Sequence, residues 1–561
     1  METLKFPVPD RWDMETDLVA IGSGIGGLSA AITANEYGIE AVVLERSALV
    51  GGVTAYSFGE LWVAGNHLAE AAGLSDSAEA GLGYMRWLSA GFGDERLIRS
   101  QAVHGPIALK FFEENAGVRW SLIRDFSDYL WPQCADGVPE GRFIEVEPFP
   151  AASLGDWQSR VRVSPHVPYG MSHKDMFGAG GIANFANWDF GVMAGRLAQD
   201  ERCLGPGLAA YFVKAALDRD IPLLTETDVV GLIQDDEGRV VGVASRRDGQ
   251  DYFVRARRGV VIATSGYDGN QGFEKRLSQH VDVHSMLGPE IDGAHLRLAG
   301  RLGAQVARVP DVSMLGYSIP GEEIEDGRPL WRNTLTEMGL PHALVVNRAG
   351  RRFGDESFYR TLAFAVDYFD GSNQSQPNFP CWIIQDAQSR AKYPFGSIMP
   401  GQDLPDGLAV KADTLAELAT RTGIDPEGLV AEVDRFNGYC EAGVDPDFHR
   451  GEKPWAKYMC GDVNNKPNPN LGPVAQAPFY AIRLERVSGG GISSTGLLID
   501  EHCRVIDYDD RPIPGVYAVG GSSARLDQGA GSQSGFSNTR GMTQGWLSAR
   551  HAAGKPSEEL A

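Results

Sequence analysis

Residues 17–59 read DLVAIGSGIGGLSAAITANEYGIEAVVLERSALVGGVTAYSFG, and this stretch decides the fold. The apolar run over 18–21 has the length and composition of a buried parallel strand. It runs into Gly22-Ser23-Gly24-Ile25-Gly26-Gly27, after which apolar residues recur at helical spacing. A second short strand over 41–44 ends at Glu45. The sequence therefore predicts a strand, a glycine turn, a helix and a second strand.

The spacing of the glycines predicts a dinucleotide-binding turn. Gly22 allows the tight turn, Gly24 lets the backbone approach a pyrophosphate, and Gly27 lets the helix pack on the strand. The N–H groups at the helix start, that of Gly26 included, attract the pyrophosphate together with the helix dipole. Glu45 can accept hydrogen bonds from a ribose, and its charge argues against NADP because it would repel a 2′-phosphate.

The residues after Glu45 indicate FAD rather than NAD. The segment Gly51-Gly52-Val53-Thr54 would wrap a second stretch of backbone around the same pyrophosphate, which simple NAD-dependent dehydrogenases rarely need. The stretch from Thr54 to Gly59 would then run beside the ribityl chain and the flavin edge. Further cofactor contacts are predicted at Arg46, Ala55, Ser57, Val229, Thr264, Gly266, Gly520, Gly521 and Ser537.

Composition sets outer limits on fold and function. A length of 561 residues suggests two or more domains, and a hydrophobic share of 43% is ample for large cores. The net charge of −23 argues against binding to nucleic acid or to an anionic membrane surface. The six cysteines show no iron–sulfur or attached-haem spacing, so we expect no metal, and thiols buried in a reducing compartment. With no signal-peptide pattern and no apolar run of about 18 residues, we expect a cytoplasmic protein without a transmembrane segment.

Later segments return to the nucleotide fold. A buried strand over 258–266 and another over 515–521 are predicted to end beside the cofactor, because both end in small residues. A Gly/Ser-rich loop, 529–535, leads into a helix over 536–553 whose start can offer N–H groups to a flavin. The predicted fold class is α/β: a Rossmann-like FAD-binding domain of the glutathione reductase type, 1–294 and 478–561, with an inserted α+β catalytic or cap domain, 295–477.

Together these motifs resemble the flavoprotein family of 3-ketosteroid dehydrogenases, soluble fumarate reductases and succinate dehydrogenase flavoprotein subunits. The resemblance covers nearly the whole chain and includes Val346-Asn347-Arg348-Ala349-Gly350-Arg351-Arg352-Phe353-Gly354-Asp355-Glu356 and 514–521. It implies an active site between the two domains, facing the flavin. Membrane-bound members attach FAD through a histidine near the second glycine pair. Thr54-Ala55-Tyr56-Ser57 contains none, so the resemblance implies non-covalent FAD.

Single positions separate the branches of this family. Fumarate reductases hold two carboxylates with histidine and arginine clamps. The stretch Gly491-Ile492-Ser493-Ser494-Thr495 has no histidine where one clamp is expected, which counts against a dicarboxylate substrate. Arg360 lies about where the fumarate reductase acid lies, so this branch stays open, and Arg525 could also serve an anion.

The ketosteroid dehydrogenases use tyrosines instead. Asp128-Tyr129-Leu130-Trp131-Pro132 is similar to one family loop, and Tyr359 lies where a second tyrosine is expected. The third family tyrosine, which binds the ketone oxygen, is missing from the loop before the last helix. That loop offers only Ser532, Gln533, Ser534 and Phe536, which is closer to relatives that desaturate the Δ4 bond or act on simple cyclic ketones.

Desaturation of the carbon–carbon bond next to a ketone needs a base for the α proton and an acceptor for the β hydride. Backbone N–H groups of the loop ending at Gly535 are predicted to form an oxyanion hole. Tyr359 and Tyr129 are the candidate bases and Tyr317 is a third, while Arg360 would favour a nearby tyrosinate.

The leading hypothesis is an FAD-dependent dehydrogenase of a cyclic ketone or 3-ketosteroid, which passes electrons to an external acceptor. The oligomeric state, including a homo-oligomer, stays open. A flavin-dependent reductase of an unsaturated acid or enone is the first alternative, and it predicts that Arg360 is essential. A monooxygenase would need NADPH access, and the sequence has no second G-x-G-x-x-G. An electron-transfer or assembly subunit would bind FAD without needing any of these tyrosines.

Overall fold

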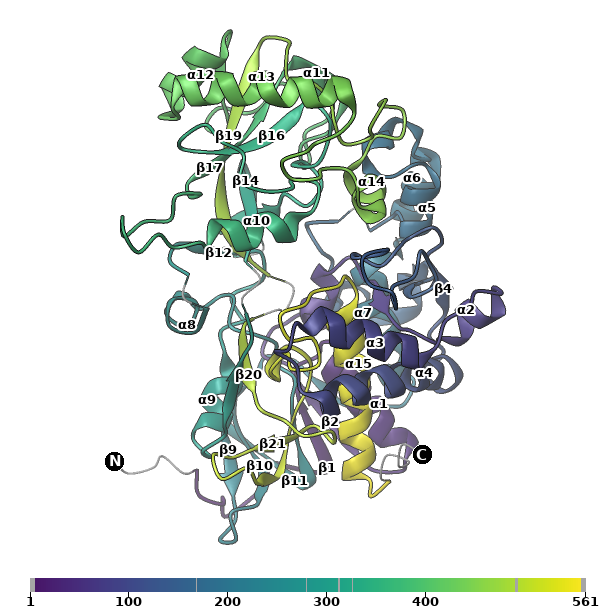
Figure 1. The fold of residues 1–561 in the computed structure, drawn as a ribbon. Coiled ribbons are helices and arrows are strands. Elements are labelled where there is room, and N and C mark those ends of the chain that lie inside the picture. Colours follow the sequence, from purple (N-terminus) through teal and green to yellow (C-terminus); the bar gives the residue numbers. More distant parts are fainter. Residues whose placement is uncertain are drawn as a thin grey trace.

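The computed structural model describes residues 6–167, 169–278, 280–310, 313–324, 326–489 and 493–555. Gly491 and Ile492 of the expected clamp position therefore lie outside the described residues. The chain forms two stacked lobes, each built on its own sheet (Figure 1). The lower lobe holds the N-terminal strand and the C-terminal helix, and the upper lobe is formed by the middle of the chain.

The lower lobe has the predicted Rossmann-like core. Its sheet has the order β21-β22-β11-β1-β2-β8, in which all strands but β21 are parallel. The bounds are β1 Met14–Ile21, β2 Ala41–Leu44, β8 Leu223–Leu224, β11 Gln250–Ile262, β21 Arg504–Ile506 and β22 Pro512–Ala518. The predicted hairpin at 235–238 joins β9, Thr227–Gln234, to β10, Val240–Arg247, and extends the sheet through β11.

Two helices from opposite ends of the chain pack against each other in this lobe. α1, Ile25–Glu36, packs on α15, Phe536–Ala552. The close approach depends on glycine, since a Cβ on Gly545 would come within 2.4 Å of the Gly26 carbonyl oxygen. Residues 67–300 also form α2 His67–Ala71, α3 Ala78–Ser89, α4 Glu95–Ala116, α5 His173–Gly178, α6 Phe190–Ala198, α7 Leu204–Leu217, α8 Gln271–Phe273 and α9 Ala294–Gly300. Of these, α5 and α6 lie beside the upper lobe (Figure 1).

The upper lobe is an α+β unit around a second, mainly antiparallel sheet. Its order is β15-β14-β19-β17-β16, from β14 Met314–Glu323, β15 Pro329–Asn333, β16 Ala343–Asn347, β17 Cys381–Gln385 and β19 Phe479–Ser488. Alternate residues of β16 face opposite sides, as a strand requires. Leu344 and Val346 pack in the core under α12, Leu415–Thr422, and α13, Pro426–Ala442, while Val345 packs against α10, Tyr359–Val366.

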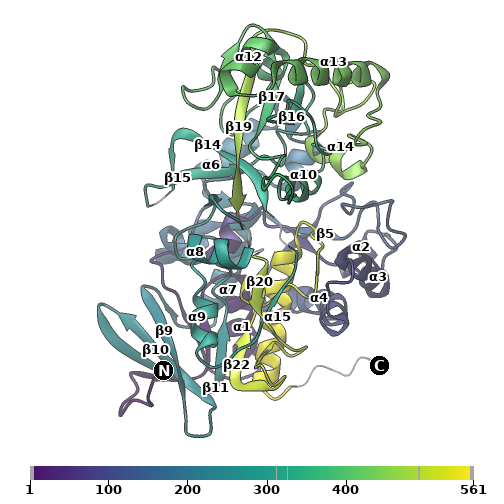
Figure 2. The ribbon, with the colours of Figure 1, turned by 60° about the vertical axis from the view of Figure 1, so that its left-hand side comes forward.

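The boundary between the lobes differs from the predicted 295–477, because strands outside that range join the upper sheet whereas α9, near its start, lies in the lower lobe. β12, Val283–Ser285, precedes that range and pairs with β19, which follows it. β19 itself lies between β14 and β17 and points from the upper lobe toward the lower one (Figure 2). The hydrophobic pattern of the sequence cannot show which sheet β19 joins, because a buried strand has the same pattern in either sheet.

Two further findings concern side chains and hydropathy. All six cysteines are free, and all six are buried, as predicted. Among the helices of the described residues, none combines the length and the apolar character that a membrane span requires.

Candidate active site

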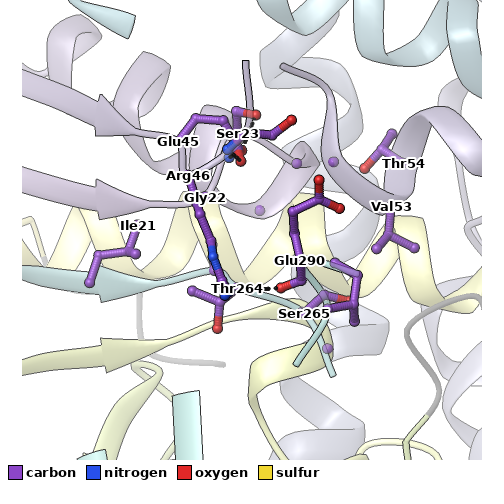
Figure 3. Close-up of a pocket in the computed structure, with 18 of the residues that line it drawn as sticks. Ile21, Gly22, Ser23, Glu45, Arg46, Val53, Thr54, Thr264, Ser265 and Glu290 are labelled. Atoms are coloured by element: carbon purple, nitrogen blue, oxygen red, sulfur yellow. Dashed lines mark hydrogen bonds between the residues drawn. The ribbon is translucent and has the colours of Figure 1, made fainter. Parts of the chain in front are cut away.

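A first pocket lies where β1, β2, β11 and β22 end, the edge at which sheets of this kind bind nucleotides (Figure 3). Segments far apart in the sequence meet there, including both glycine-rich turns and the start of α15. Most residues predicted to hold the cofactor line this pocket: Gly22, Gly24, Gly26, Glu45, Arg46, Gly52, Thr54, Val229, Thr264, Gly520, Gly521 and Ser537.

Glu45 is fixed at the end of β2 by hydrogen bonds from its neighbours. Its Oε2 accepts from the Ser23 N–H at 3.0 Å and from the Ser23 hydroxyl at 2.5 Å, and its Oε1 accepts from the Ser47 N–H at 2.9 Å. The Ser23 Oγ in turn accepts from the Gly51 N–H at 3.1 Å, which joins the two glycine-rich turns. The sequence spacing found the acid but missed Ser23, because a serine inside a glycine turn carries no signal of its own.

The residues present fit a dinucleotide such as FAD. A Cβ built on Gly24 would meet only the Thr54 Oγ1, at 3.7 Å, so the backbone at this turn is open to the pocket. Gly24 caps α1 without a side-chain hydrogen bond. The Ile25 N–H donates to the Thr54 Oγ1 at 2.9 Å, so the N–H groups of the following residues in the first turn are the ones that would serve phosphate oxygens. Gly52 closes against the same turn, since its Cβ would lie 3.1 Å from the Gly24 nitrogen. Both glycine turns would therefore hold the pyrophosphate.

The remaining predicted residues surround the pocket rather than line it. Ser57 lines the cavity described below instead. Gly27 serves packing, as predicted, because its Cβ would come within 2.0 Å of the Gly22 carbonyl oxygen. The others lie behind the lining: Gly51, Ala55, Gly59 and Gly266.

Arg162 and Glu290 are charged residues of this pocket that sequence reasoning missed. Arg162 donates to the Tyr56 hydroxyl at 2.9 Å and to the Ser47 Oγ at 2.9 Å, and it lies 3.9 Å from Glu290. The Glu290 side chain lies between the Glu45 and Thr54 sides of the pocket (Figure 3). No local motif marks either residue, because the loops that carry them reach the pocket only through the tertiary fold.

A second cavity of about 590 Å³ lies between the lobes and adjoins the first pocket. Val53, Tyr56, Ser537 and Asn538 line both spaces, so a cofactor held in the pocket would reach the cavity at this point. The walls are largely apolar and include Ile182, Phe185, Trp188, Met286, Met314 and Met459.

The structure brings the two leading tyrosine candidates together on the cavity wall. Tyr129 comes from the loop between β4, Trp120–Leu122, and β5, Phe143–Val146, and Tyr359 is the first residue of α10. Their ring centroids are 6.2 Å apart, with the planes nearly perpendicular. Tyr129 belongs to the lower lobe and Tyr359 to the upper one, so the pair exists only when the lobes are assembled.

Buried ion pairs hold each tyrosine in place. Next to Tyr129, the Asp128 carboxylate accepts from the Trp62 Nε1 at 2.7 Å and pairs with Arg142 at 2.8 Å. Before Tyr359, Arg352 pairs with Glu356 at 2.7 Å, and the side chains of both are fully buried. Breaking a pair of this kind leaves an uncompensated buried charge, so both loops are strongly restrained.

The hydroxyl of Tyr129 lies in a chain of polar groups. Burial raises the pKa of Tyr129 well above its usual value, and the nearby charges of Tyr359 and Glu60 raise it further, while a hydrogen bond with Ser534 opposes the rise. The Ser534 hydroxyl donates to the Glu60 Oε2 at 2.8 Å, and the Glu60 Oε1 lies 3.4 Å from the His173 Nε2. Sequence reasoning named Ser534 but missed Glu60 and His173.

The other catalytic candidates lie differently. Gly535 lines the cavity at the start of α15 with φ of 84°, and a Cβ there would clash with the Trp62 nitrogen at 2.6 Å. Arg360 is buried behind the wall, where it donates to the Ala530 carbonyl at 3.1 Å. Tyr317 also lies behind the wall, and its hydroxyl donates to the Glu337 Oε1 at 2.7 Å.

Comparisons with known proteins agree with this geometry. The sequence profile of the FAD binding domain family matches residues 17–537. The chain is 36% identical to 4-oxocyclohexanecarboxylate 2-dehydrogenase of Sinomonas cyclohexanicum, over 96% of this chain and 93% of that protein. It is 30% identical to 3-oxosteroid 1-dehydrogenase of Mycolicibacterium smegmatis, over 91% and 92%. The structure superimposes on 3-ketosteroid delta1-dehydrogenase from Sterolibacterium denitrificans, in complex with 1,4-androstadiene-3,17-dione, with a TM-score of 0.87 and 29% identity over 96% of this chain and 99% of that one.

Proposed function

The chain belongs to the FAD-binding flavoprotein family whose profile it matches, and on that premise we propose that it desaturates the bond α,β to the ketone of a cyclic substrate. The observation that carries the proposal is the tyrosine pair on the wall of a large apolar cavity that adjoins the dinucleotide pocket. The relatives and the cavity both argue against an electron-transfer subunit, because a subunit without a substrate of its own does not need a large substrate cavity.

The residues of the cavity supply the acid–base part of this reaction. Tyr359, in its deprotonated form, removes the α proton, and the electron pair of the broken C–H bond moves onto the ketone oxygen. The β hydrogen then leaves as a hydride, so that the carbonyl re-forms together with a new carbon–carbon double bond. When bound, FAD supplies the oxidant that accepts the hydride. Tyr129 stays protonated, consistent with its raised pKa, and supports the Tyr359 phenolate by hydrogen bonding.

The size and charge of the cavity support a polycyclic neutral ketone. Its volume is within the range of roughly 300–1,000 Å³ that holds drug-sized ligands. Arg332 is the cationic side chain that we find among the described lining residues, and it already pairs with Glu322. A substrate carboxylate would have to compete with that pair. A 3-ketosteroid is therefore the first candidate.

A 4-oxocyclohexanecarboxylate-type ring is the second candidate, and the 36% identical relative favours it. Both candidates need an external electron acceptor, because the reduced cofactor must be reoxidised for another turnover. Non-covalent FAD is part of the proposal, since the stretch 54–57, of which Thr54 and Tyr56 line the pocket, contains no histidine.

An anaerobic titration of the FAD-loaded enzyme tests the proposal. Addition of a 3-ketosteroid should bleach the flavin absorbance stoichiometrically, with a product 2 Da lighter than the substrate; 4-oxocyclohexanecarboxylate should do so less effectively. If neither ketone bleaches the flavin, but an enone or unsaturated acid reoxidises chemically reduced enzyme, the reductase alternative replaces this proposal.

A further inference from the structure

Gln533 lies in the loop before α15, where its side chain lines the cavity and is 4% exposed. Its Oε1 accepts a hydrogen bond from the Tyr84 hydroxyl at 2.7 Å and another from the Tyr129 backbone N–H at 3.2 Å. A backbone N–H can only donate, so the atom that faces it must be the amide oxygen. The orientation of the amide is therefore fixed, and its NH₂ group points away from both partners.

That NH₂ group is a buried donor without an acceptor. The Gln533 Nε2 has no hydrogen-bond partner among the described residues, although it is shielded from solvent. Buried polar groups in native proteins are nearly always paired, and each exception calls for an explanation. The donor is fixed by its own amide oxygen, has no acceptor among the described residues and belongs to a residue that lines a ligand cavity, so a ligand acceptor explains it. A ketone oxygen is the acceptor that the proposed substrates share.

We propose that the Gln533 side-chain amide is the catalytic donor that binds the ketone oxygen and stabilises the enolate, a role that rests on the proposed desaturation. The α carbon is bonded to the carbonyl carbon, so the donor and the base must be neighbours. Gln533 meets this condition, because it contacts the backbone of Tyr129, which stacks edge-on against Tyr359.

The loop that carries Gln533 is preorganised for this task. The Ala530 carbonyl accepts from Arg360 at 3.1 Å, and the Ala530 N–H donates to the Ser89 carbonyl at 3.1 Å. Gly535 closes the loop in a left-handed conformation that also places it on the cavity wall. Donors held in advance at the site of developing charge stabilise it without reorganisation, which is the requirement for an oxyanion hole.

Gln533→Glu is the decisive variant. A carboxylate keeps the shape and both acceptor contacts to Tyr84 and Tyr129 but replaces the donor by a negative oxygen. We expect the kcat/KM for ketone desaturation to fall roughly 100- to 1,000-fold, the usual loss for one oxyanion-hole donor. We expect the same fall in the exchange of α hydrogens with D₂O, followed by NMR on chemically reduced enzyme, where enolisation occurs without desaturation.

A pH profile separates this role from a structural one. The ratio of Gln533→Glu to wild-type activity should rise as the pH falls, because the introduced carboxyl group regains an O–H donor when it is protonated. Tyr84→Phe is the matched control: it removes one contact to Oε1 but leaves the NH₂ group, so its loss should not exceed about tenfold, well below that of Gln533→Glu. If Gln533→Glu fails to fold, Gln533→Met replaces it, with the same expected loss in both assays and no recovery at low pH.

The outcomes are distinguishable. If wild-type enzyme desaturates the ketone and Gln533→Glu stays within about threefold of it in both assays, the role of Gln533 is refuted and the proposed function stands. A variant that loses activity together with FAD content or thermal stability, without a loss of α exchange in the fraction that stays folded and FAD-loaded, also refutes it. If wild-type enzyme neither desaturates nor exchanges α hydrogens of either ketone, the proposed function itself fails, and this role fails with it.

Discussion

The dinucleotide pocket and the ketone cavity adjoin each other but are built in different ways. Nearly half of the residues that line the pocket come from one contiguous stretch, residues 17–59, which also supplies both of its glycine-rich turns. The cavity is lined by side chains from many separate segments in both lobes, and most of them are apolar. A binding site formed by backbone turns depends on the positions of glycine in the sequence. A cavity lined by side chains depends on which residues the tertiary fold brings together. The two sites should therefore respond differently to substitution.

Tyr359→Phe is expected to give the largest difference between the effects on the two sites. This change removes the base from the cavity wall but leaves every residue of the dinucleotide pocket in place. We expect kcat for ketone desaturation to fall about 1,000-fold, within the usual range for general base catalysis, with FAD content unchanged. Steady-state kinetics and the flavin absorbance of the purified protein measure the two effects.

Tyr317→Phe is the matched control for that change. Tyr317 is more deeply buried than Tyr359, its hydroxyl is hydrogen bonded, and it lies behind the cavity wall. We expect activity within a few fold of wild type and a stability loss of about 1–3 kcal/mol, because Glu337 loses its donor. If Tyr317→Phe abolishes activity and Tyr359→Phe does not, the base is assigned to the wrong tyrosine.

Substitutions at two glycines distinguish a role in ligand binding from a role in packing near the dinucleotide pocket. A Cβ at Gly24 meets only Thr54, at 3.7 Å, so Gly24→Ala should fold normally and yet bind FAD at least about 100-fold more weakly, or about 2.7 kcal/mol. A Cβ at Gly27 would lie 2.0 Å from the Gly22 carbonyl oxygen, so Gly27→Ala should instead destabilise the apoprotein by about 1–3 kcal/mol or more.

Urea unfolding of the two apoproteins and titration with FAD measure these effects. A normal FAD affinity in Gly24→Ala would contradict the position of the pyrophosphate at this turn. Equal stability losses in the two variants would show that both glycines serve packing alone.

The difference between the sites also explains what the sequence could predict. The glycine turns, Glu45 and the strand ends follow local spacing rules, and the structure places them around one pocket as predicted. Tyr129 and Tyr359 entered through a family resemblance, and no local pattern shows that they meet. Glu60, Arg162 and the orientation of Gln533 were missed, because each depends on contacts between distant segments. The assignment of β19 to the second sheet failed to emerge for the same reason.

A smaller effect, on substrate preference, is expected when Arg332, a cationic side chain of the cavity, loses its ion-pair partner. Glu322→Gln removes the carboxylate that pairs with Arg332, so that a substrate carboxylate no longer has to displace it. We expect the ratio of kcat/KM for 4-oxocyclohexanecarboxylate to that for a 3-ketosteroid to rise about tenfold, or about 1.4 kcal/mol. Competition assays with both ketones measure the ratio. An unchanged ratio, with Arg332→Gln equally silent, would mean that Arg332 does not contact the substrate.

The smallest predicted effect is on the pH dependence of the free energy of unfolding, through one histidine of the cavity wall. His166 lines the cavity, and its Nε2–H donates to the Met286 carbonyl at 2.8 Å. Burial, together with the positive charge of Arg332, lowers the pKa of His166 from 6.5 to about 4. The unfolded chain therefore binds a proton at this site before the folded one does, and the stabilising contribution of His166 is lost as the pH falls from above 6.5 toward 4.

The linkage relation gives a loss of about 1 kcal/mol between pH 7 and pH 5.5 from this residue. His166→Gln keeps an N–H donor for Met286 but cannot take up the proton, so its free energy of unfolding should fall about 1 kcal/mol less over the same interval. Urea midpoints of FAD-loaded wild type and variant at the two pH values measure the difference. Parallel losses would mean that His166 is not held neutral by the apolar wall. In that case water reaches the cavity wall at His166 more freely than its apolar lining suggests.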